Sequence, residues 1–295
     1  MILTSGASEA LAIGLGRAKA KRRIVSAVEH DAVFRAAPDA TIVPMGSDGR
    51  VDGPALSAAL RAAPEQALVA IQHVNSETGT PQDIDAIAIA VDVAGGVLMC
   101  DAAQSGGRYD LPCADMIVVS AHKCGGPPGV GALLVRDLGL LEASGGQERG
   151  YRGGTENLPG ALGFAAALEV SDRRLDADTL DALDHLRKAV EMAGGAAIRL
   201  EAGQMPHIQP LAMPRLSATA QLVQFDLAGF AVSAGSACSS GSLKPSRALA
   251  AFGIAPDLAA RTIRVSIGWN TTGEEVRAFT EAWLKIAEAA RARAA

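Results

Sequence analysis

Two ionisable residues stand where predicted strands end, and their types suit covalent chemistry on a carbonyl group. Asp101 closes the stretch Val97-Leu-Met-Cys-Asp101, and Lys123 follows the end of the next apolar stretch. An unpaired buried ammonium is costly, whereas a Schiff-base lysine must be neutral or already an imine. A carboxylate at a strand end can keep a pyridinium ring protonated, which makes the ring an electron sink. Each residue alone also fits a structural role, as a snorkelling lysine or a turn-capping aspartate. Their occurrence together favours the chemical role.

A third stretch, Leu3-Thr-Ser-Gly-Ala-Ser-Glu-Ala10, combines a strand end, a turn of small residues and a helix start. Backbone N–H groups at the start of a helix, together with the hydroxyls of Ser5 and Ser8, suit a phosphate group. The same pattern is also ordinary helix capping. The phosphate interpretation therefore depends on Asp101 and Lys123.

Alternating strands and helices must position these residues. Strand patterns cover residues 23–28, 41–45, 67–74, 96–102, 116–120 and 131–135, and helical patterns cover residues 9–20, 54–63 and 83–93. The strands are apolar on both faces, as in a sheet covered by helices on both sides. This alternation predicts an α/β fold with a mainly parallel sheet.

The pattern changes after about residue 159. Long helices are predicted for residues 161–170 and 175–192, followed by shorter strands near Ile198, Ala231 and Ile263. The last helix opens with the capping box Thr272-Gly-Glu-Glu275. We predict a large domain over residues 1–173 and a smaller α+β domain over residues 174–295.

Composition limits the classes of function. Hydrophobic residues make up 49% of the 295 residues, which excludes a disordered chain. A net charge of −5 and an aromatic content of 3% argue against direct nucleic-acid binding. We find no secretory signal and no membrane span, and the four cysteines form neither a C-x-x-C pair nor a metal-ligand grouping. We therefore expect free thiols and a cytoplasmic protein.

Further motifs follow in order along the chain. They are Val28-Glu-His30, Val74-Asn-Ser-Glu-Thr-Gly79, Gly145-Gly-Gln-Glu-Arg-Gly-Tyr-Arg-Gly-Gly-Thr-Glu-Asn157, Ser233-Ala-Gly-Ser-Ala-Cys-Ser-Ser-Gly241, Pro245-Ser246 and Ile263-Arg-Val-Ser266. Together with the three stretches above, this series resembles the cysteine desulfurases, which are pyridoxal 5'-phosphate (PLP) enzymes of the class V aminotransferase group. The resemblance implies the type I PLP-dependent transferase fold, with a seven-stranded-type sheet between helices.

The resemblance also implies a cofactor site. Lys123 would hold PLP covalently, Asp101 would pair with the ring nitrogen, and Gln104 would bond to the phenolic oxygen. His30 would stack on the ring and assist proton transfer, and Asn75 would contact the cofactor. The phosphate would be bound by Ala7, Ser8, Ser120, His122 and, from a neighbouring subunit, Thr155.

The substrate chemistry would centre on Cys238. Arg264 would bind the α-carboxylate of L-cysteine with its guanidinium fork, and Ser76 would contact the substrate. The Cys238 thiolate would then attack the substrate sulfur, giving L-alanine and a persulfide on Cys238. Small polar neighbours of Cys238 favour a mobile loop. Metal contact is expected at most as a transient touch between Cys238 and an iron–sulfur cluster.

The sequence departs from the family pattern twice. Ser76 stands where the family usually has a second asparagine, and a serine side chain is shorter. Family members also normally carry a few dozen residues before the Thr-Ser-Gly-Ala turn, including a helix on the dimer surface. Because this sequence begins at that turn, we expect it to bind PLP weakly or to dissolve poorly.

The implied partners are L-cysteine, a second copy of the chain in a homodimer with shared sites, and a sulfur acceptor such as an iron–sulfur scaffold. The sulfur would serve iron–sulfur cluster assembly or thiolation. The alternatives are a selenocysteine lyase, another class V enzyme such as an aminotransferase, or a truncated non-catalytic homologue. The thiol-bearing loop argues against an aminotransferase, whose chemistry needs no nucleophilic thiol.

Overall fold

The structure is a computed structural model that describes residues 1–63, 65–170, 175–235 and 245–292. The chain divides into two compact units. The first comprises Met1–Gly46, Arg50–Asn75 and Pro81–Arg173, and the second comprises Ser47–Gly49, Ser76–Thr80 and Arg174–Ala295. The domain boundary predicted at residues 173 and 174 stays a prediction, because both lie outside the described residues. Within the described ranges, no helix has the length and apolar character needed to cross a bilayer.

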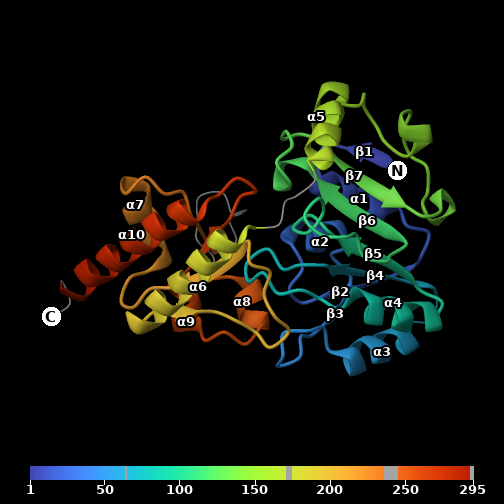
Figure 1. The fold of residues 1–295 in the computed structure, drawn as a ribbon. Coiled ribbons are helices and arrows are strands. Elements are labelled where there is room, and N and C mark those ends of the chain that lie inside the picture. The colour runs from blue at the N-terminus through green and yellow to red at the C-terminus, as the bar shows by residue number, and fades with distance from the viewer. Residues whose placement is uncertain (64, 171–174, 236–244, 293–295) are drawn as a thin grey trace. The chain divides into compact units, whose positions relative to one another are not determined.

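The first unit is built on a seven-stranded sheet (Figure 1). In spatial order its strands are β1 (Ile2–Thr4), β7 (Gly131–Val135), β6 (Met116–Ser120), β5 (Val97–Asp101), β4 (Ala67–Gln72), β2 (Arg22–Ser26) and β3 (Thr41–Val43). β7 pairs antiparallel with both β1 and β6, and the other neighbours pair in parallel. Six strands therefore share one direction, which confirms the predicted mainly parallel sheet.

Helices cover both faces of this sheet. They are α1 (Ala7–Arg17), α2 (Asp31–Ala36), α3 (Gly53–Ala62), α4 (Ile84–Val93) and α5 (Leu158–Glu169). Met99 packs in the cluster that contains α1 and α2, whereas its neighbours Leu98 and Cys100 pack in the cluster that contains α3 and α4. Successive side chains of a strand point to opposite faces, so burial on both faces requires an unbroken apolar run.

The second unit has a four-stranded antiparallel sheet. In spatial order its strands are β10 (Ser233–Ala234), β11 (Thr262–Ser266), β9 (Ile208–Ala212) and β8 (Ala196–Ala197). The helices of this unit are α6 (Ala177–Met192), α7 (Ala218–Leu227), α8 (Arg247–Ala251), α9 (Pro256–Ala260) and α10 (Gly273–Ala292). These elements form the predicted smaller α+β part.

Aromatic side chains contribute to the core of the second unit. Phe225 stacks on Phe279 with 4.8 Å between the ring centroids, and Trp283 of α10 is fully buried. The predicted capping box begins α10. The Thr272 N–H donates to Glu275 Oε2 at 2.8 Å, and the Glu275 N–H donates to Thr272 Oγ1 at 3.2 Å.

Candidate active site

Five of the expected site residues follow strands of the parallel sheet. His30 comes after β2, Asn75 after β4 and Asp101 at the end of β5, while Ser120 ends β6 and Lys123 follows it. Parallel strands end at one edge of their sheet, and open α/β sheets build their sites at that edge. The topology thus brings these residues to a common edge of the first unit.

Asp101 is a buried carboxylate whose pKa is subject to opposing effects. Its Oδ1 accepts a hydrogen bond of 2.9 Å from the Ala103 N–H. Burial raises the pKa of Asp101, and this effect is opposed by the Ala103 hydrogen bond and by the charges of His30 and Lys123. A cation beside Asp101 would therefore favour its ionised form. This is the property required of a partner for a protonated ring nitrogen.

His30 has a structural role in addition to the one that the motif indicates. Its Nδ1 accepts a hydrogen bond of 3.1 Å from the Ala32 N–H and caps α2. Because Nδ1 accepts, the neutral ring carries its proton on Nε2. Burial lowers the pKa of His30, the charges of Asp101 and Asp31 oppose that shift, and Lys123 adds to it. The imidazole is therefore neutral near pH 7.

Lys123 ends a 3-10 turn, Ala121–Lys123, that follows β6 directly. The residue is exposed, so the expected burial of Lys123 at a strand end is wrong, and the cost of a buried ammonium does not apply to it. The strand stops at Ser120, and the turn carries the lysine out of the sheet. Ser120 Oγ lies 3.0 Å from His122 Nδ1. Burial and the charge of Lys123 lower the pKa of His122.

At the turn predicted to bind phosphate, the backbone of Gly6 lies close to the backbone of Gly131. Gly6, at φ 147°, precedes α1 and caps it without a side-chain hydrogen bond. A Cβ on Gly131 would lie 2.7 Å from the Cα of Gly6, and a Cβ on Gly6 would lie 3.8 Å from Ser120 Oγ. The start of α1, with Ala7 half-buried and Ser8 exposed, therefore lies beside the end of β6. Below, we call Gly6, Ala7, Ser8 and Ser120 the cradle.

A buried polar network that the sequence analysis did not predict supports the ends of β2 and β4. Glu29 Oε1 accepts hydrogen bonds from Ser26 Oγ at 2.5 Å and from the Gln72 N–H at 3.0 Å. The carbonyl oxygen of Val28 accepts from Gln72 Nε2 at 2.6 Å and from Asn75 Nδ2 at 3.2 Å. These contacts fix the segment that carries His30 and give Asn75 a structural partner. The only sequence signal was the position of Glu29 inside the Val28-Glu-His30 motif.

Arg264 and Ser76, the two residues expected to bind the substrate, contact each other within the second unit. Nη1 of Arg264 donates to the Ser76 carbonyl oxygen at 3.0 Å, and its Nε donates to Ser266 Oγ at 3.2 Å. The partner in Ser76 is the backbone, so this contact does not depend on the replacement of asparagine by serine. The guanidinium is held on β11, and Arg264 is half-buried.

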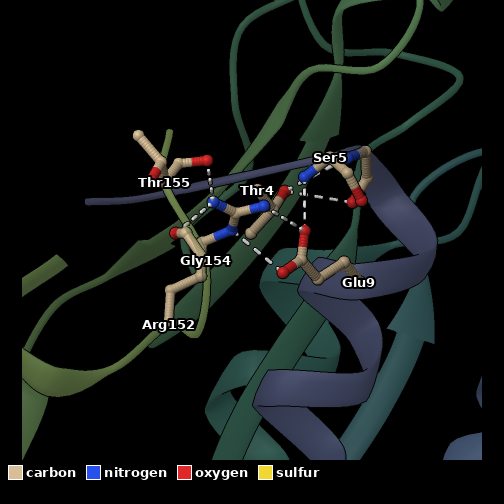
Figure 2. A network of polar contacts seen from close by, with 7 residues as sticks. Thr4, Ser5, Glu9, Arg152, Gly154 and Thr155 are labelled. Carbon is tan, nitrogen blue, oxygen red and sulfur yellow. Dashed lines mark hydrogen bonds and ion pairs between the residues drawn. The ribbon is translucent and has the colours of Figure 1, made fainter. Parts of the chain in front are cut away.

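Gln104 and Thr155 lie outside the strands of the sheet. Gln104 is half-buried on the turn that follows β5. Thr155 is exposed, and its carbonyl oxygen accepts from Arg152 Nη1 at 3.2 Å (Figure 2). Cys238 lies outside the described residues. The cysteines Cys100, Cys113 and Cys124 carry free thiols, and burial raises the pKa of Cys100 well above its usual value.

The donor set suits a phosphorylated pyridine aldehyde such as PLP. A lysine amine can bind the aldehyde, a buried carboxylate can pair with the ring nitrogen, and a neutral imidazole can stack on the ring. At the cradle, Gly6 leaves open the space that a Cβ would fill beside the Ser120 hydroxyl. Among the described residues, no group of three or more His, Cys, Asp or Glu side chains could hold a metal ion.

Comparison with known proteins gives three kinds of match. The family Aminotransferase class-V matches residues 1–279. The cysteine desulfurase IscS of Anaeromyxobacter sp. (strain Fw109-5) is 36% identical over 94% of this chain and 74% of its own length.

Two solved structures are similar in fold. A NifS-like protein from Rickettsia africae ESF-5 superposes with a TM-score of 0.83 at 24% identity, over 97% of this chain and 81% of its own. SspA in complex with cysteine superposes with a TM-score of 0.72 at 27% identity, over 90% of this chain and 80% of its own.

Proposed function

The chain belongs to the class V aminotransferase family and, within it, to the cysteine desulfurases, and from this premise we infer that it removes the sulfur atom of L-cysteine with PLP as cofactor. The family membership confirms the resemblance that the motifs predict. In the proposed reaction, L-cysteine and the Cys238 thiol give L-alanine and a Cys238 persulfide. The C–S bond of the substrate breaks, an S–S bond forms, and one hydrogen passes to the alanine methyl group. No external oxidant is needed.

One observation carries the proposal: Lys123, Asp101 and His30 stand at or just after the carboxyl ends of β6, β5 and β2, three strands of one parallel sheet, in a chain of this family. PLP, when bound, supplies an electron sink that makes the α-proton of an amino acid acidic. Lys123 would hold it covalently, Asp101 would pair with its ring nitrogen and His30 would cover one face. Gln104 and Asn75 would contact the ring substituents, and the phosphate would be bound by Ala7, Ser8, Ser120 and His122.

We assign the remaining steps to side chains of this protein. The Asp101 carboxylate would accept a hydrogen bond from the protonated ring nitrogen and so keep the proton on that nitrogen, and the opposite charge of the ring would offset the cost of burying the carboxylate. The Lys123 amine is the base proposed for the α-proton, because its exposed side chain is accessible to a substrate. His30 carries its proton on Nε2 and can donate it, since Nδ1 is engaged with Ala32. Arg264 would orient the substrate carboxylate, next to Ser76.

The proposal also includes a second subunit and a sulfur acceptor as partners. Thr155 is exposed, as a residue that serves a neighbouring subunit must be, so we include a homodimer with shared sites. A protein acceptor, such as an iron–sulfur scaffold, would take the persulfide sulfur for cluster assembly or thiolation. The free thiols of Cys100, Cys113 and Cys124 are compatible with the reducing cytoplasm. A selenocysteine lyase or an aminotransferase is not favoured, because the relatives carry the name cysteine desulfurase.

The test measures alanine formed from L-cysteine, with dithiothreitol present to release the persulfide sulfur as sulfide. We expect turnover by the native chain, loss of more than about a hundredfold for Cys238→Ser, and no loss for the matched control Cys113→Ser, which removes an exposed thiol. Equal turnover by Cys238→Ser and native protein would show that Cys238 is not the nucleophile. Absence of turnover in every variant would favour the non-catalytic homologue.

A further inference from the structure

Arg152 and Glu9 form a bidentate ion pair to which the proposed function assigns no role (Figure 2). Arg152 Nε donates to Glu9 Oε1 at 2.9 Å, and Nη2 donates to Glu9 Oε2 at 3.3 Å. The two side chains are only 12% and 26% exposed, so water screens this pair less than an ordinary surface pair. The partners are 143 positions apart in the sequence.

Glu9 lies in the first turn of α1, directly after the cradle residues Ala7 and Ser8. Its Oε2 also accepts a hydrogen bond from the Ser5 N–H, in the turn that leads into the helix. Burial raises the pKa of Glu9, but the hydrogen bonds from Ser5 and Arg152 outweigh this effect and the net shift is downward. The carboxylate is therefore ionised near pH 7.

An ionised carboxylate at this position conflicts with the binding of a second anion. The start of a helix carries a partial positive charge that attracts anions, and the Glu9 carboxylate already neutralises much of that charge. A phosphate dianion at Ala7 and Ser8 would be repelled by Glu9 across the same helical turn. The repulsion must be cancelled for the cradle to hold a phosphate group.

Arg152 has the geometry to cancel it. Besides its two bonds to Glu9, its Nη1 donates to the carbonyl oxygens of Gly154 at 3.0 Å and Thr155 at 3.2 Å. The guanidinium is thus fixed by contacts on both sides, and its charge stays beside Glu9. Residues 153–155 are held against the start of α1 by the same side chain.

We propose that Arg152 is a positioning residue for the phosphate end of the cofactor, which it serves by neutralising Glu9 and leaving the start of α1 attractive to an anion. The inference rests on the proposed function, because it takes PLP as the ligand. It extends that function to a residue that touches neither the reacting atoms nor, in its present contacts, the cradle itself.

The test compares the affinities of the cofactor-free chain for PLP and for pyridoxal, which lacks the phosphate. Binding is followed by absorbance, without substrate. We expect Arg152→Gln to weaken PLP binding about tenfold and pyridoxal binding less than about twofold. The double variant Glu9→Gln with Arg152→Gln removes the repelling charge as well, so it should recover most of the PLP affinity. Glu9→Gln alone should bind PLP at least as tightly as the native chain.

Two further variants separate charge from folding. Arg149→Gln removes an exposed positive charge from the same segment and should leave both affinities unchanged. Arg152→Lys keeps the charge without the fork, so it should retain PLP affinity within about threefold even where Arg152→Gln folds poorly.

Three results would overturn the inference. They are an equal loss of PLP and pyridoxal affinity in Arg152→Gln, a double variant that binds PLP as weakly as Arg152→Gln, and an Arg152→Lys variant as weak as Arg152→Gln. A native chain that binds neither PLP nor pyridoxal would instead refute the proposed function, and the inference with it.

Discussion

Replacing Gly131 with alanine tests whether the cradle depends on close backbone contact. Gly131 begins β7 and lies between β6 and the turn that leads into α1. A Cβ at this position would lie 2.7 Å from both the Gly6 Cα and the Val119 carbonyl oxygen. Ordinary van der Waals contacts of a Cβ begin at 3.4 Å, and both neighbours are backbone atoms that cannot rotate away. The strand or the turn must therefore move by more than half an ångström.

The cost follows from this overlap. Extra atoms forced into a packed site destabilise a protein by about 1–3 kcal/mol. The smaller conformational freedom of alanine in the unfolded chain returns about 0.4–1 kcal/mol. We expect Gly131→Ala to lower the free energy of unfolding by about 1–2 kcal/mol and to weaken PLP binding, because Gly6 must move.

Gly16→Ala is the matched control. Gly16 lies inside α1, and a Cβ there would meet nothing within 4 Å. This substitution should stabilise the chain by about 0.5–1 kcal/mol, since glycine is a poor helix residue. The two substitutions are therefore expected to change the free energy of unfolding in opposite directions.

Trp269 and Trp283 both belong to the second unit, so their fluorescence would not report on the first. Urea unfolding is therefore followed by far-ultraviolet circular dichroism, and hydrogen exchange is measured on peptides that cover β6 and β7. If Gly131→Ala were as stable as Gly16→Ala and bound PLP as tightly, the steric argument for the cradle would be refuted.

Two further predictions concern stability. Trp283→Ala should lower the free energy of unfolding by about 3–5 kcal/mol, because it empties a fully buried site in the second unit. Within the described part of the chain the Trp283 Nε1 has no hydrogen-bond partner, so Trp283→Phe should cost clearly less in a urea titration, and an equal cost would contradict this. Burial lowers the pKa of His73 below its usual value of about 6.5, with Asp85 opposing, and His73 Nδ1 lies 2.9 Å from Ser105 Oγ. As the pH falls below about 7, the unfolded chain therefore binds more protons than the folded chain, so the free energy of unfolding should decline between about pH 7.5 and 5.5. The decline should be smaller in His73→Gln. If the urea midpoints of the native chain and of His73→Gln changed equally with pH, this role of His73 would be contradicted.

The central strands were predictable because they are buried on both faces. The predictions for residues 116–120 and 131–135 coincide with β6 and β7. α2 was missed because it has only six residues and is capped by His30, which is not a common cap residue. β9 was missed because of Pro210, since proline is rare inside sheets. The proline is tolerated because it has no N–H to leave unpaired, and its carbonyl oxygen accepts from the Ile198 N–H at 3.0 Å.

Site residues in local sequence motifs could be predicted, whereas contacts between residues far apart in the sequence could not. Asp101, Ser120 and Lys123 could be identified because each stands at or near a recognisable strand end. The contact of Glu29 with Gln72 spans 43 positions and exists because β4 lies beside β2 in the sheet. Such a contact depends on strand order, which local patterns do not contain. The exposure of Lys123 was likewise unpredictable, because it depends on a three-residue turn after the strand.

The pairing of β1 with β7 also fixes when the site can form during synthesis. Ile2 lies opposite Leu133, and Thr4 lies opposite Gly131. At about 5–20 residues per second, a ribosome needs roughly 6–26 s to add the residues between these partners. Until then the buried side chains of Ile2, Leu11 and Leu15 lack part of their cluster, because Leu133 belongs to it. During that time the apolar side chains of β1 and α1 stay exposed in the nascent chain, and chaperones that bind apolar segments would bind this one.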